Sequence, residues 1–342
     1  MDTINILVVN KISDECLKQI ASTNPRIKIL PAFRIWEAPD STTTEGIDCN
    51  DEEFNKMLAQ AEIIFGFRTP KNVVARAPRL KWVQTFIAGI DHFLDRDIVD
   101  SDVIITNTSG MHNISITELA FEKMLMLVKM APLYLRYQQE KKWVRHQPGT
   151  AVPLALGRLH GKTLGIIGLG NVGRRIAYVG KAFGMRVIAT RRSARKISRA
   201  RNVDIVYPRE QLGQLMAESD FITMVLPSTP ETKHIVGEKE LRMMKPTAFL
   251  INVGRGDTVD EEALVRALEE KWIAGAGLDA FTVEPLPKES KLWDLPNVIL
   301  TPHLAGPMEN FLQRVTNLFC ENLKRYIEGE RLFNVTDKKH GY

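Results

Sequence analysis

Side chains that can carry out acid–base and carboxylate chemistry follow three predicted strands in the second half of the chain. Arg255 comes after an apolar run at 248–253, Asp279 ends the run 274–279, and His303 follows the run 298–301. Glu284 lies in a proline-rich loop shortly after Asp279. Ligands of open parallel sheets bind outside the carboxyl ends of the strands. We therefore expect these four side chains to meet at one edge of a sheet.

These four residue types suit hydride transfer to a 2-oxo acid. The carbonyl oxygen gains negative charge and needs a proton, which histidine supplies most readily near neutral pH. Glu284 would orient the His303 ring and favour imidazolium. Arg255 offers a planar fork for a carboxylate, and Asp279 can accept a hydrogen bond from a nicotinamide carboxamide. Taken singly, each has a structural alternative: an exposed arginine, a helix cap, a surface carboxylate or a core histidine.

A glycine-rich turn earlier in the chain favours the catalytic interpretation of these four residues over the structural alternatives. An apolar run at 164–167 leads into Gly168-x-Gly170-x-x-Gly173, and a helical pattern and a second apolar strand at 186–190 follow. Gly168 permits a tight turn, Gly170 lets the backbone approach a pyrophosphate, and Gly173 lets the helix pack on the strand. The first helical residues, Asn171 and Val172, would face the phosphates. An ordinary turn is the alternative, but the strand–helix–strand context favours a dinucleotide site.

The end of the second strand favours NADP over NAD. The segment 186–190 leads into Arg191, Arg192 and Ser193, and no acidic residue occurs between positions 183 and 202. In NAD-specific sites an acidic residue here binds the ribose 2′-hydroxyl. Two arginines would instead bind a 2′-phosphate through charge-assisted hydrogen bonds. We predict NADPH as the preferred cofactor, with NADH possible; a solvated basic face with mixed cofactor use is the alternative.

Composition excludes several other classes of protein. The net charge is +5, and six basic residues lie between Arg191 and Arg201. Aromatic residues interspersed among these basic residues, or a helix-turn-helix pattern, would support a nucleic-acid partner, and the chain shows neither. No apolar run approaches the roughly 20 residues of a membrane span. Three separated cysteines without a CxxC pair predict a cytoplasmic protein with no disulfide framework and no metal site.

The order of elements predicts two doubly wound α/β domains with parallel sheets and a cleft between them. Short β-branched runs alternate with helical patterns, and 342 residues suffice for two cores. One domain would comprise residues 1–108 plus 307–342 and bind substrate, and the other, residues 109–306, would bind the dinucleotide. Strands are expected at 6–10, 27–30, 61–67, 81–86 and 103–107, and at 163–168, 186–190, 203–206, 221–226, 248–253, 274–279 and 298–301.

Helices and loops complete this expectation. Ser115-x-x-Glu118 has the form of a capping box that would open a long helix, and apolar residues recur at helical spacing from 116 to 131. Core packing best explains this stripe, and part of it could form a subunit interface. A further helical pattern at 310–326 returns the chain to the first domain, where residues 34–50 form a long polar loop.

The chain resembles the D-isomer-specific 2-hydroxyacid dehydrogenases, in particular NADPH-preferring glyoxylate/hydroxypyruvate reductases. The matching segments are 161–177, 252–256, 275–285 and 301–306, with weaker similarity at 80–91 and beyond. The resemblance implies NAD(P)H-dependent reduction of a 2-oxo acid to a D-2-hydroxy acid, with Arg255, Glu284 and His303 as the catalytic set. Many members carry histidine in place of Leu119 and an acidic residue in place of Thr282.

The resemblance also assigns residues that the spacing alone does not. It implies cofactor contacts, beyond the glycine turn, from Pro227, Thr232, Val253, Gly254, Arg255, Asp279, His303 and Gly306. It implies that backbone N–H groups of the loop 86–90 (Ile87, Ala88, Gly89) share the substrate carboxylate with Arg255. Beyond the resemblance, we expect a substrate pocket at His303 that is lined by Phe67, Arg68, Phe86 and Ile87, and Arg68 there would suit an acidic tail. A homodimer is implied through an arm at 113–146, with Trp143 reaching toward the neighbour.

Two alternatives remain open at this level. Nucleotide-sensing corepressors share the fold and retain the same three catalytic residue types, so these residues do not exclude such a role. Such proteins typically add tails and peptide-binding surfaces, whereas only a short polar segment follows Asn334. An enzyme of the same fold that oxidises formate or phosphite is the second alternative. His303 argues against the formate branch, and the phosphite branch typically prefers NAD.

Overall fold

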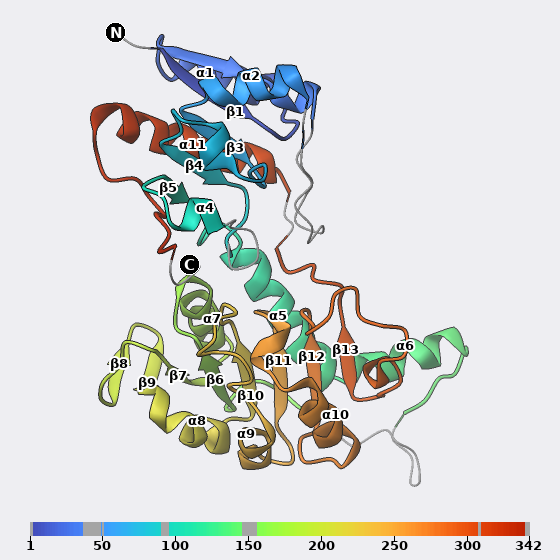
Figure 1. Cartoon of the computed structure of the whole chain (residues 1–342). Coiled ribbons are helices and arrows are strands. Elements are labelled where there is room, and N and C mark those ends of the chain that lie inside the picture. Colours follow the sequence, from blue (N-terminus) through green and yellow to red (C-terminus); the bar gives the residue numbers. More distant parts are fainter. Residues whose placement is uncertain are drawn as a thin grey trace. The chain divides into compact units, whose positions relative to one another are not determined.

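The chain forms two compact units in a computed structural model that describes residues 3–36, 49, 51–89, 96–145, 156–306 and 309–338. Unit 1 comprises Met1–Met111 and Met308–Tyr342, and unit 2 comprises His112–Pro307. Figure 1 shows each unit as a sheet with helices packed against it. Most of the predicted loop 34–50, residue 90 of the loop 86–90 and residue 146 of the predicted arm lie outside the described residues.

Unit 1 is built on a parallel sheet with strand order β2-β1-β3-β4-β5. Its central strands are mostly apolar and buried along their whole length, as a parallel sheet covered by helices requires. Helices α1 and α11 cover one face, and α2, α3 and α4 cover the other. The bounds are β1 Ile4–Val8, β2 Ile27–Leu30, β3 Ile63–Gly66, β4 Trp82–Thr85, β5 Ile104–Thr106, α1 Asp14–Ser22, α2 Glu52–Gln60, α3 Val73–Arg76, α4 Arg96–Val99 and α11 Phe311–Glu328.

Unit 2 contains a larger sheet with order β13-β12-β11-β10-β6-β7-β9-β8. All neighbouring strands are parallel except β8, which pairs antiparallel with β9. Strand β8 is absent from the sequence-based expectation, because its three residues, Ser-Arg-Ala, offer no apolar run. The bounds are β6 Thr163–Ile167, β7 Arg186–Thr190, β8 Ser198–Ala200, β9 Val203–Tyr207, β10 Phe221–Met224, β11 Phe249–Asn252, β12 Gly275–Leu278 and β13 Val298–Leu300.

Helices cover both faces of this second sheet. Helices α5 (Asn113–Val128) and α7 (Asn171–Ala182) pack on one face. Helices α8 (Leu212–Glu218), α9 (Glu238–Met243) and α10 (Glu261–Glu269) pack on the other. The predicted capping box is wrong: α5 already begins at Asn113, so Ser115 lies inside the helix. After α5 the chain turns at Met130 into α6 (Ala131–Gln139). None of the described helices is both long and apolar enough for a membrane span.

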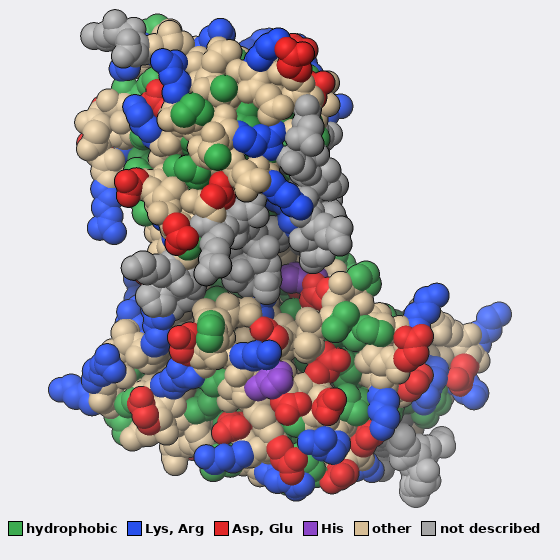
Figure 2. Space-filling view, in the orientation of Figure 1, with side chains coloured by type: hydrophobic (Ala, Val, Ile, Leu, Met, Phe, Trp, Pro, Cys, Tyr) green, Lys and Arg blue, Asp and Glu red, His purple; other side chains and the backbone are tan. Residues whose placement is uncertain are grey.

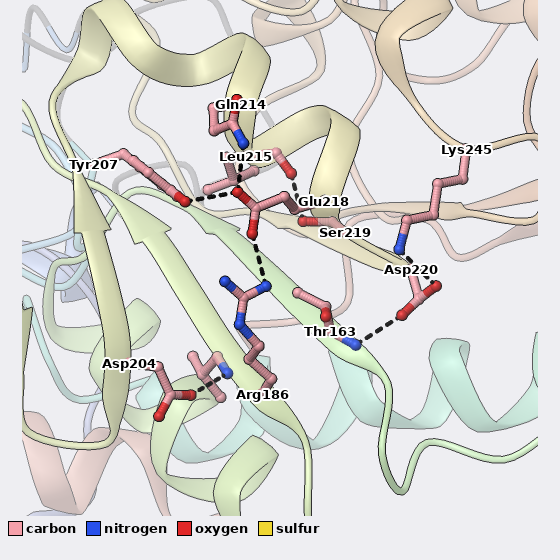
Figure 3. Close-up of polar contacts among 11 residues, drawn as sticks. Thr163, Arg186, Asp204, Tyr207, Gln214, Leu215, Glu218, Ser219, Asp220 and Lys245 are labelled. Carbon is pink, nitrogen blue, oxygen red and sulfur yellow. Dashed lines mark hydrogen bonds and ion pairs between the residues drawn. The ribbon is translucent and has the colours of Figure 1, made fainter. Parts of the chain in front are cut away.

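Charged side chains near the amino ends of the strands are paired within the fold (Figure 3). Asp220, just before β10, accepts hydrogen bonds from the Thr163 backbone N–H at 2.8 Å and from Lys245 Nζ at 3.0 Å. Arg186, which opens β7, forms an ion pair of 2.7 Å with Glu218 at the end of α8. These contacts tie helices and loops to the strands. The candidate site lies at the opposite, carboxyl edge.

Candidate functional site

The glycine turn lies at the point where the strand order of unit 2 reverses. Strands β6 and β10 are neighbours, and the chain builds the sheet outward from them in opposite directions. Ligands of such sheets bind at this switch point. Gly168 directly follows β6 and has a φ of +105°, a conformation that glycine adopts without strain. A Cβ there would lie 2.9 Å from Leu226 Cδ2 and 3.1 Å from the Val225 carbonyl oxygen.

The start of α7 fits the pyrophosphate of a dinucleotide. A Cβ on Gly173 would lie 2.1 Å from the Gly168 carbonyl oxygen, so only glycine allows the helix to approach the turn this closely. Around the Cβ position of Gly170, by contrast, no heavy atom of the described residues other than its own chain neighbours lies within 4 Å. The space over Gly170 is therefore open, and the first N–H groups of α7, at Asn171 and Val172, are oriented toward that end.

The basic residues after β7 are exposed. Arg191, Arg192 and Ser193 all lie on the surface, and the remaining basic residues up to Arg201 are exposed as well. In Figure 2, Lys and Arg side chains gather over the left end of unit 2, where Figure 1 places β8 and β9. The Arg191 backbone N–H donates to the Tyr207 carbonyl at 3.4 Å, which ties the strand end to β9. Both guanidinium groups can therefore reach an anion in solution without displacing the core.

The loops that follow β10 and β11 contact each other beside the glycine turn. Thr232 Oγ1 donates to the Pro227 carbonyl at 2.7 Å and accepts from the Thr229 N–H at 2.8 Å, which closes the turn after β10. Buried Val253 and then Gly254 follow β11. A Cβ on Gly254 would lie 2.9 Å from the Leu226 carbonyl oxygen, so the two loops pack at backbone distance. Four of the predicted cofactor residues thus lie on adjacent loops at the carboxyl edge of the sheet: Pro227, Thr232, Val253 and Gly254.

Arg255 is held by the loop after β11. Its carbonyl oxygen accepts from Thr258 Oγ1 at 2.6 Å and from Asn252 Nδ2 at 2.9 Å. Its guanidinium donates to the Gly254 carbonyl at 3.2 Å, and the side chain is half-buried. The following Gly256 allows close packing, because a Cβ there would lie 1.9 Å from the Phe281 carbonyl carbon. The backbone of Arg255 is therefore fixed by contacts on both sides.

His303 and Glu284 form a direct pair. His303 Nδ1 lies 2.8 Å from Glu284 Oε2, and Glu284 Oε1 accepts the Phe281 backbone N–H at 2.9 Å. Burial by itself would raise the pKa of Glu284. The hydrogen bonds from His303 and Phe281, together with the charges of His303 and Arg255, outweigh burial and lower that pKa. The ionised carboxylate accepts the Nδ1 proton, which leaves Nε2 of His303 for proton exchange.

Glu284→Gln tests the ionisation of this pair. The folded-state pKa of Glu284 is lowered, so its ionised carboxylate stabilises the folded protein above the unfolded pKa of about 4.3. This contribution to stability is lost as pH falls through the folded-state pKa. We expect wild type to resist urea better than Glu284→Gln at pH 6, and this advantage to shrink below pH ~4. The effect will be small because the carboxylate side chain is 37% exposed. Glu289→Gln, an exposed carboxylate on the same loop, is the matched control; equal differences at both pH values would contradict the expectation.

Asp279 performs a task that the sequence did not indicate. Its carboxylate is buried and accepts the N–H groups of Leu304 and Ala305, each at 2.9 Å, and the hydroxyl of Thr301 at 2.5 Å. Its carbonyl oxygen accepts the His303 N–H at 2.9 Å. His303 itself has a φ of +52°, unusual for a residue with a side chain. Asp279 therefore holds the segment that carries His303; its contact with a nicotinamide carboxamide stays a prediction.

Lys123 is a candidate that the sequence analysis missed. It lies in α5 with 1% of its surface exposed, and its Nζ donates to Thr301 Oγ1 at 2.7 Å. Gly277 in β12 makes room for it, since a Cβ there would lie 2.8 Å from Lys123 Cβ. One signal was present: Lys123 follows Leu119 by four residues and Ile116 by seven, which places a charge on the apolar face of the helix.

The predicted substrate residues of unit 1 follow the ends of β3 and β4. The Phe67 ring packs against that of Phe86, and the Arg68 side chain is buried. The Ala88 carbonyl accepts a hydrogen bond from Asn107 Nδ2 at 2.7 Å, which holds the loop after β4. The Ile87 N–H donates to Thr85 Oγ1 at 3.0 Å. The Ile87 N–H is thus already paired within the loop, and the carboxylate-binding role of residues 87–89 stays a prediction.

Gly306 closes the described part of unit 2 at this edge. Its carbonyl oxygen accepts a hydrogen bond of 2.6 Å from Nδ1 of His112, the residue before α5. Burial lowers the pKa of His112, and the hydrogen bond to Gly306 opposes that shift. The contact ties the first residue of unit 2 to the segment that follows His303.

Comparison with known proteins establishes the family. The model of the D-isomer specific 2-hydroxyacid dehydrogenase NAD binding domain matches residues 121–305. The glyoxylate reductase of Thermococcus litoralis is 36% identical over 272 residues, which span 79% of this chain and 81% of that protein. The chain belongs to the D-isomer specific 2-hydroxyacid dehydrogenase family. The predicted family and reaction class, NAD(P)H-dependent reduction of a 2-oxo acid, are thereby confirmed.

Solved structures of similar dehydrogenases confirm the fold. A family member from Aeromonas salmonicida is 30% identical, with a TM-score of 0.79 over 98% of this chain and 100% of its own. A dehydrogenase from Xanthobacter autotrophicus, solved in complex with NADPH and MES, is 27% identical, with a TM-score of 0.77 over 100% of both chains. The predicted α/β class with parallel sheets is correct for this dehydrogenase. These relatives give the corepressor alternative no support.

Proposed function

We propose that this dehydrogenase is an NADPH-preferring reductase of small 2-oxo acids of the glyoxylate and hydroxypyruvate type, with Arg255, Glu284 and His303 as its catalytic residues. The observation that carries the proposal is the His303–Glu284 pair at 2.8 Å, at the sheet edge where the glycine turn leaves open space. The similar protein of Thermococcus litoralis is a glyoxylate reductase, and the Xanthobacter dehydrogenase was solved with NADPH. Exposed Arg191 and Arg192 suit a 2′-phosphate.

In this proposal the cofactor binds along the glycine turn and the loops beside it. The open space over Gly170 and the N-terminus of α7 would take the pyrophosphate, and Arg191, Arg192 and Ser193 the 2′-phosphate. Pro227, Thr232, Val253, Gly254, Asp279 and Gly306 complete the proposed set of cofactor residues. When bound, reduced nicotinamide supplies the hydride that the substrate carbonyl carbon accepts.

His303 supplies the proton in this proposal. Its Nδ1 donates to Glu284, so Nε2 is the nitrogen that gives a proton to the carbonyl oxygen as negative charge develops there. In the oxidative direction the same nitrogen takes the hydroxyl proton. Glu284 fixes the ring of His303, since its second carboxylate oxygen is anchored by the Phe281 N–H. The pair therefore works as one unit.

Arg255 binds the substrate carboxylate, and Arg255→Lys tests this role. Lysine keeps the charge but loses the planar fork that binds both carboxylate oxygens. We expect the KM for the 2-oxo acid to rise about 10- to 100-fold, with a smaller change in kcat. Steady-state kinetics at saturating NADPH measure both constants. Arg266→Lys in α10 is the matched control, and an unchanged KM in Arg255→Lys would contradict the role.

The oligomeric state and the substrate-binding residues of the enzyme are further parts of the proposal. We propose a homodimer through the arm at 113–146. Support comes from large apolar side chains of this segment that are exposed in the single chain: Trp143 at 93%, Leu135 at 51% and Ile114 at 42%. Sedimentation of wild type and Trp143→Ala tests this. The substrate roles of Phe67, Arg68, Ile87, Ala88 and Gly89, and the cytoplasmic location, stay predictions.

A direct assay tests the reaction. The loss of reduced-nicotinamide absorbance is followed with NADPH and NADH in parallel, against glyoxylate, hydroxypyruvate, pyruvate and bulkier 2-oxo acids. We expect turnover with NADPH, a preference for the small acids, and a product of D configuration by chiral chromatography wherever the product is chiral. Absence of turnover with every acid, despite NADPH binding measured by fluorescence, would contradict the proposal.

A further inference from the structure

A buried lysine lies behind the segment that carries His303. Lys123 extends from α5, which packs against β11 and β12, and its ammonium is shielded from solvent. A charged lysine is among the side chains least often fully buried, and burial of the charge is costly unless it is paired. Its position inside an otherwise apolar helix face therefore calls for a partner.

That partner is the hydrogen-bonded pair of Thr301 and Asp279. Lys123 Nζ donates to Thr301 Oγ1 at 2.7 Å, and the Thr301 hydroxyl donates to Asp279 Oδ1. The Asp279 carboxylate then accepts the backbone N–H groups of Leu304 and Ala305. The backbone N–H of His303, the residue before Leu304, donates to the carbonyl oxygens of Asp279 and Thr301 at 2.9 and 3.0 Å.

We propose that Lys123 is a positioning residue for His303, because its ammonium stabilises the Thr301–Asp279 pair that fixes the backbone of residues 303–305. This role rests on the proposed function of His303 as the proton donor. Without the ammonium, the buried Asp279 carboxylate would keep its hydrogen-bond donors but lose the positive charge of Lys123. The left-handed conformation of His303 would then lose part of the network that maintains it.

The charges that face Lys123 agree with this assignment. Burial lowers the pKa of Lys123, and the negative charges of Asp279, at the end of β12, and of Glu122, in α5, oppose that shift. A lysine whose folded-state pKa is lowered costs stability while it is protonated. Wild type should therefore gain stability relative to Lys123→Met as pH rises from the lowered folded pKa toward the ordinary value of about 10.4.

Three variants test the inference: Lys123→Met, Thr301→Val and the double variant. Methionine matches the lysine stem without the charge, so the variant should fold. We expect each single variant to lower kcat about 10- to 100-fold, with less than about a threefold change in the Kd for NADPH. If Lys123 acts through Thr301, the double variant loses no more than the worse single variant. Lys129→Met, at the exposed end of α5, is the control and should keep wild-type kcat.

Nitrogen NMR of the histidine rings provides a readout independent of turnover. In ¹⁵N-histidine-labelled enzyme, His303 signals are assigned by their absence in His303→Ala. We expect the Nδ1–H signal of His303 to shift or broaden in Lys123→Met and to remain in Lys129→Met. Unchanged His303 signals, unchanged kcat, or additive losses in the double variant would each overturn the inference. If wild type reduces no 2-oxo acid, the proton-donor role fails, while the NMR comparison still decides whether Lys123 positions the ring.

Discussion

Replacement of His303 by alanine is expected to lower kcat for 2-oxo acid reduction by about 10²- to 10⁴-fold. The carbonyl oxygen then has no positioned proton donor as it gains negative charge. The KM for the acid should change much less, because Arg255 and its loop contacts remain. Stopped-flow and steady-state kinetics with NADPH and the best substrate of the panel measure the loss.

The control for His303→Ala is His160→Ala. His160 is exposed in the turn before β6, at the amino edge of the sheet, away from the candidate site. The His160→Ala variant should leave kcat unchanged. This control separates the loss of the proton donor from the general effect of removing an imidazole. A His303→Ala enzyme whose kcat stays within about threefold of wild type would rule out His303 as the proton donor.

Replacement of Arg191 by aspartate is expected to lower the ratio of kcat/KM with NADPH to kcat/KM with NADH by about 100-fold. A charge-assisted hydrogen bond contributes roughly 1.5–3 kcal/mol, and every 1.4 kcal/mol is about tenfold in affinity. Aspartate removes the bond to the 2′-phosphate, adds repulsion, and supplies the acidic group that binds a ribose 2′-hydroxyl in NAD-specific sites. The efficiency with NADH should therefore rise while that with NADPH falls.

The charge-matched control for this change is Arg199→Asp. Arg199 is exposed in β8, part of the same basic cluster but not at the end of β7. If the cluster attracts NADPH only through its summed charge, both variants lower the ratio equally. If the strand end recognises the phosphate, only Arg191→Asp changes it strongly. An unchanged ratio in Arg191→Asp would show that the assignment of Arg191 is wrong.

The arrangement of strands and the place of the candidate site were predictable because both follow from local patterns. Short β-branched runs separated by helical patterns indicated parallel sheets, and parallel sheets bring the carboxyl ends of their strands to one edge. Polar residues just after such runs, as Arg255 and His303 are, must then share that edge. The 2.8 Å contact between His303 and Glu284 agrees with this expectation.

The same reasoning failed where a local pattern is weak or ambiguous. Strand β8 has no apolar run and exists because its backbone pairs with β9. The start of α5 was misplaced because Ser115 and Glu118 have capping-box spacing, although the helix already begins at Asn113. In both cases the contacts of the segment, and not its own residues, determine the local structure.

The family, the glycine turn and the residue types available for catalysis could be read from the chain, because each depends on neighbours close along it. Which polar groups are buried together becomes apparent only in the folded protein. Lys123 and Thr301 are 178 residues apart, and nothing in either segment indicates the contact between them. The cost of burying an unpaired charge makes such contacts specific, but the partner becomes apparent only when α5 packs on the sheet and brings Lys123 to Thr301 and Asp279.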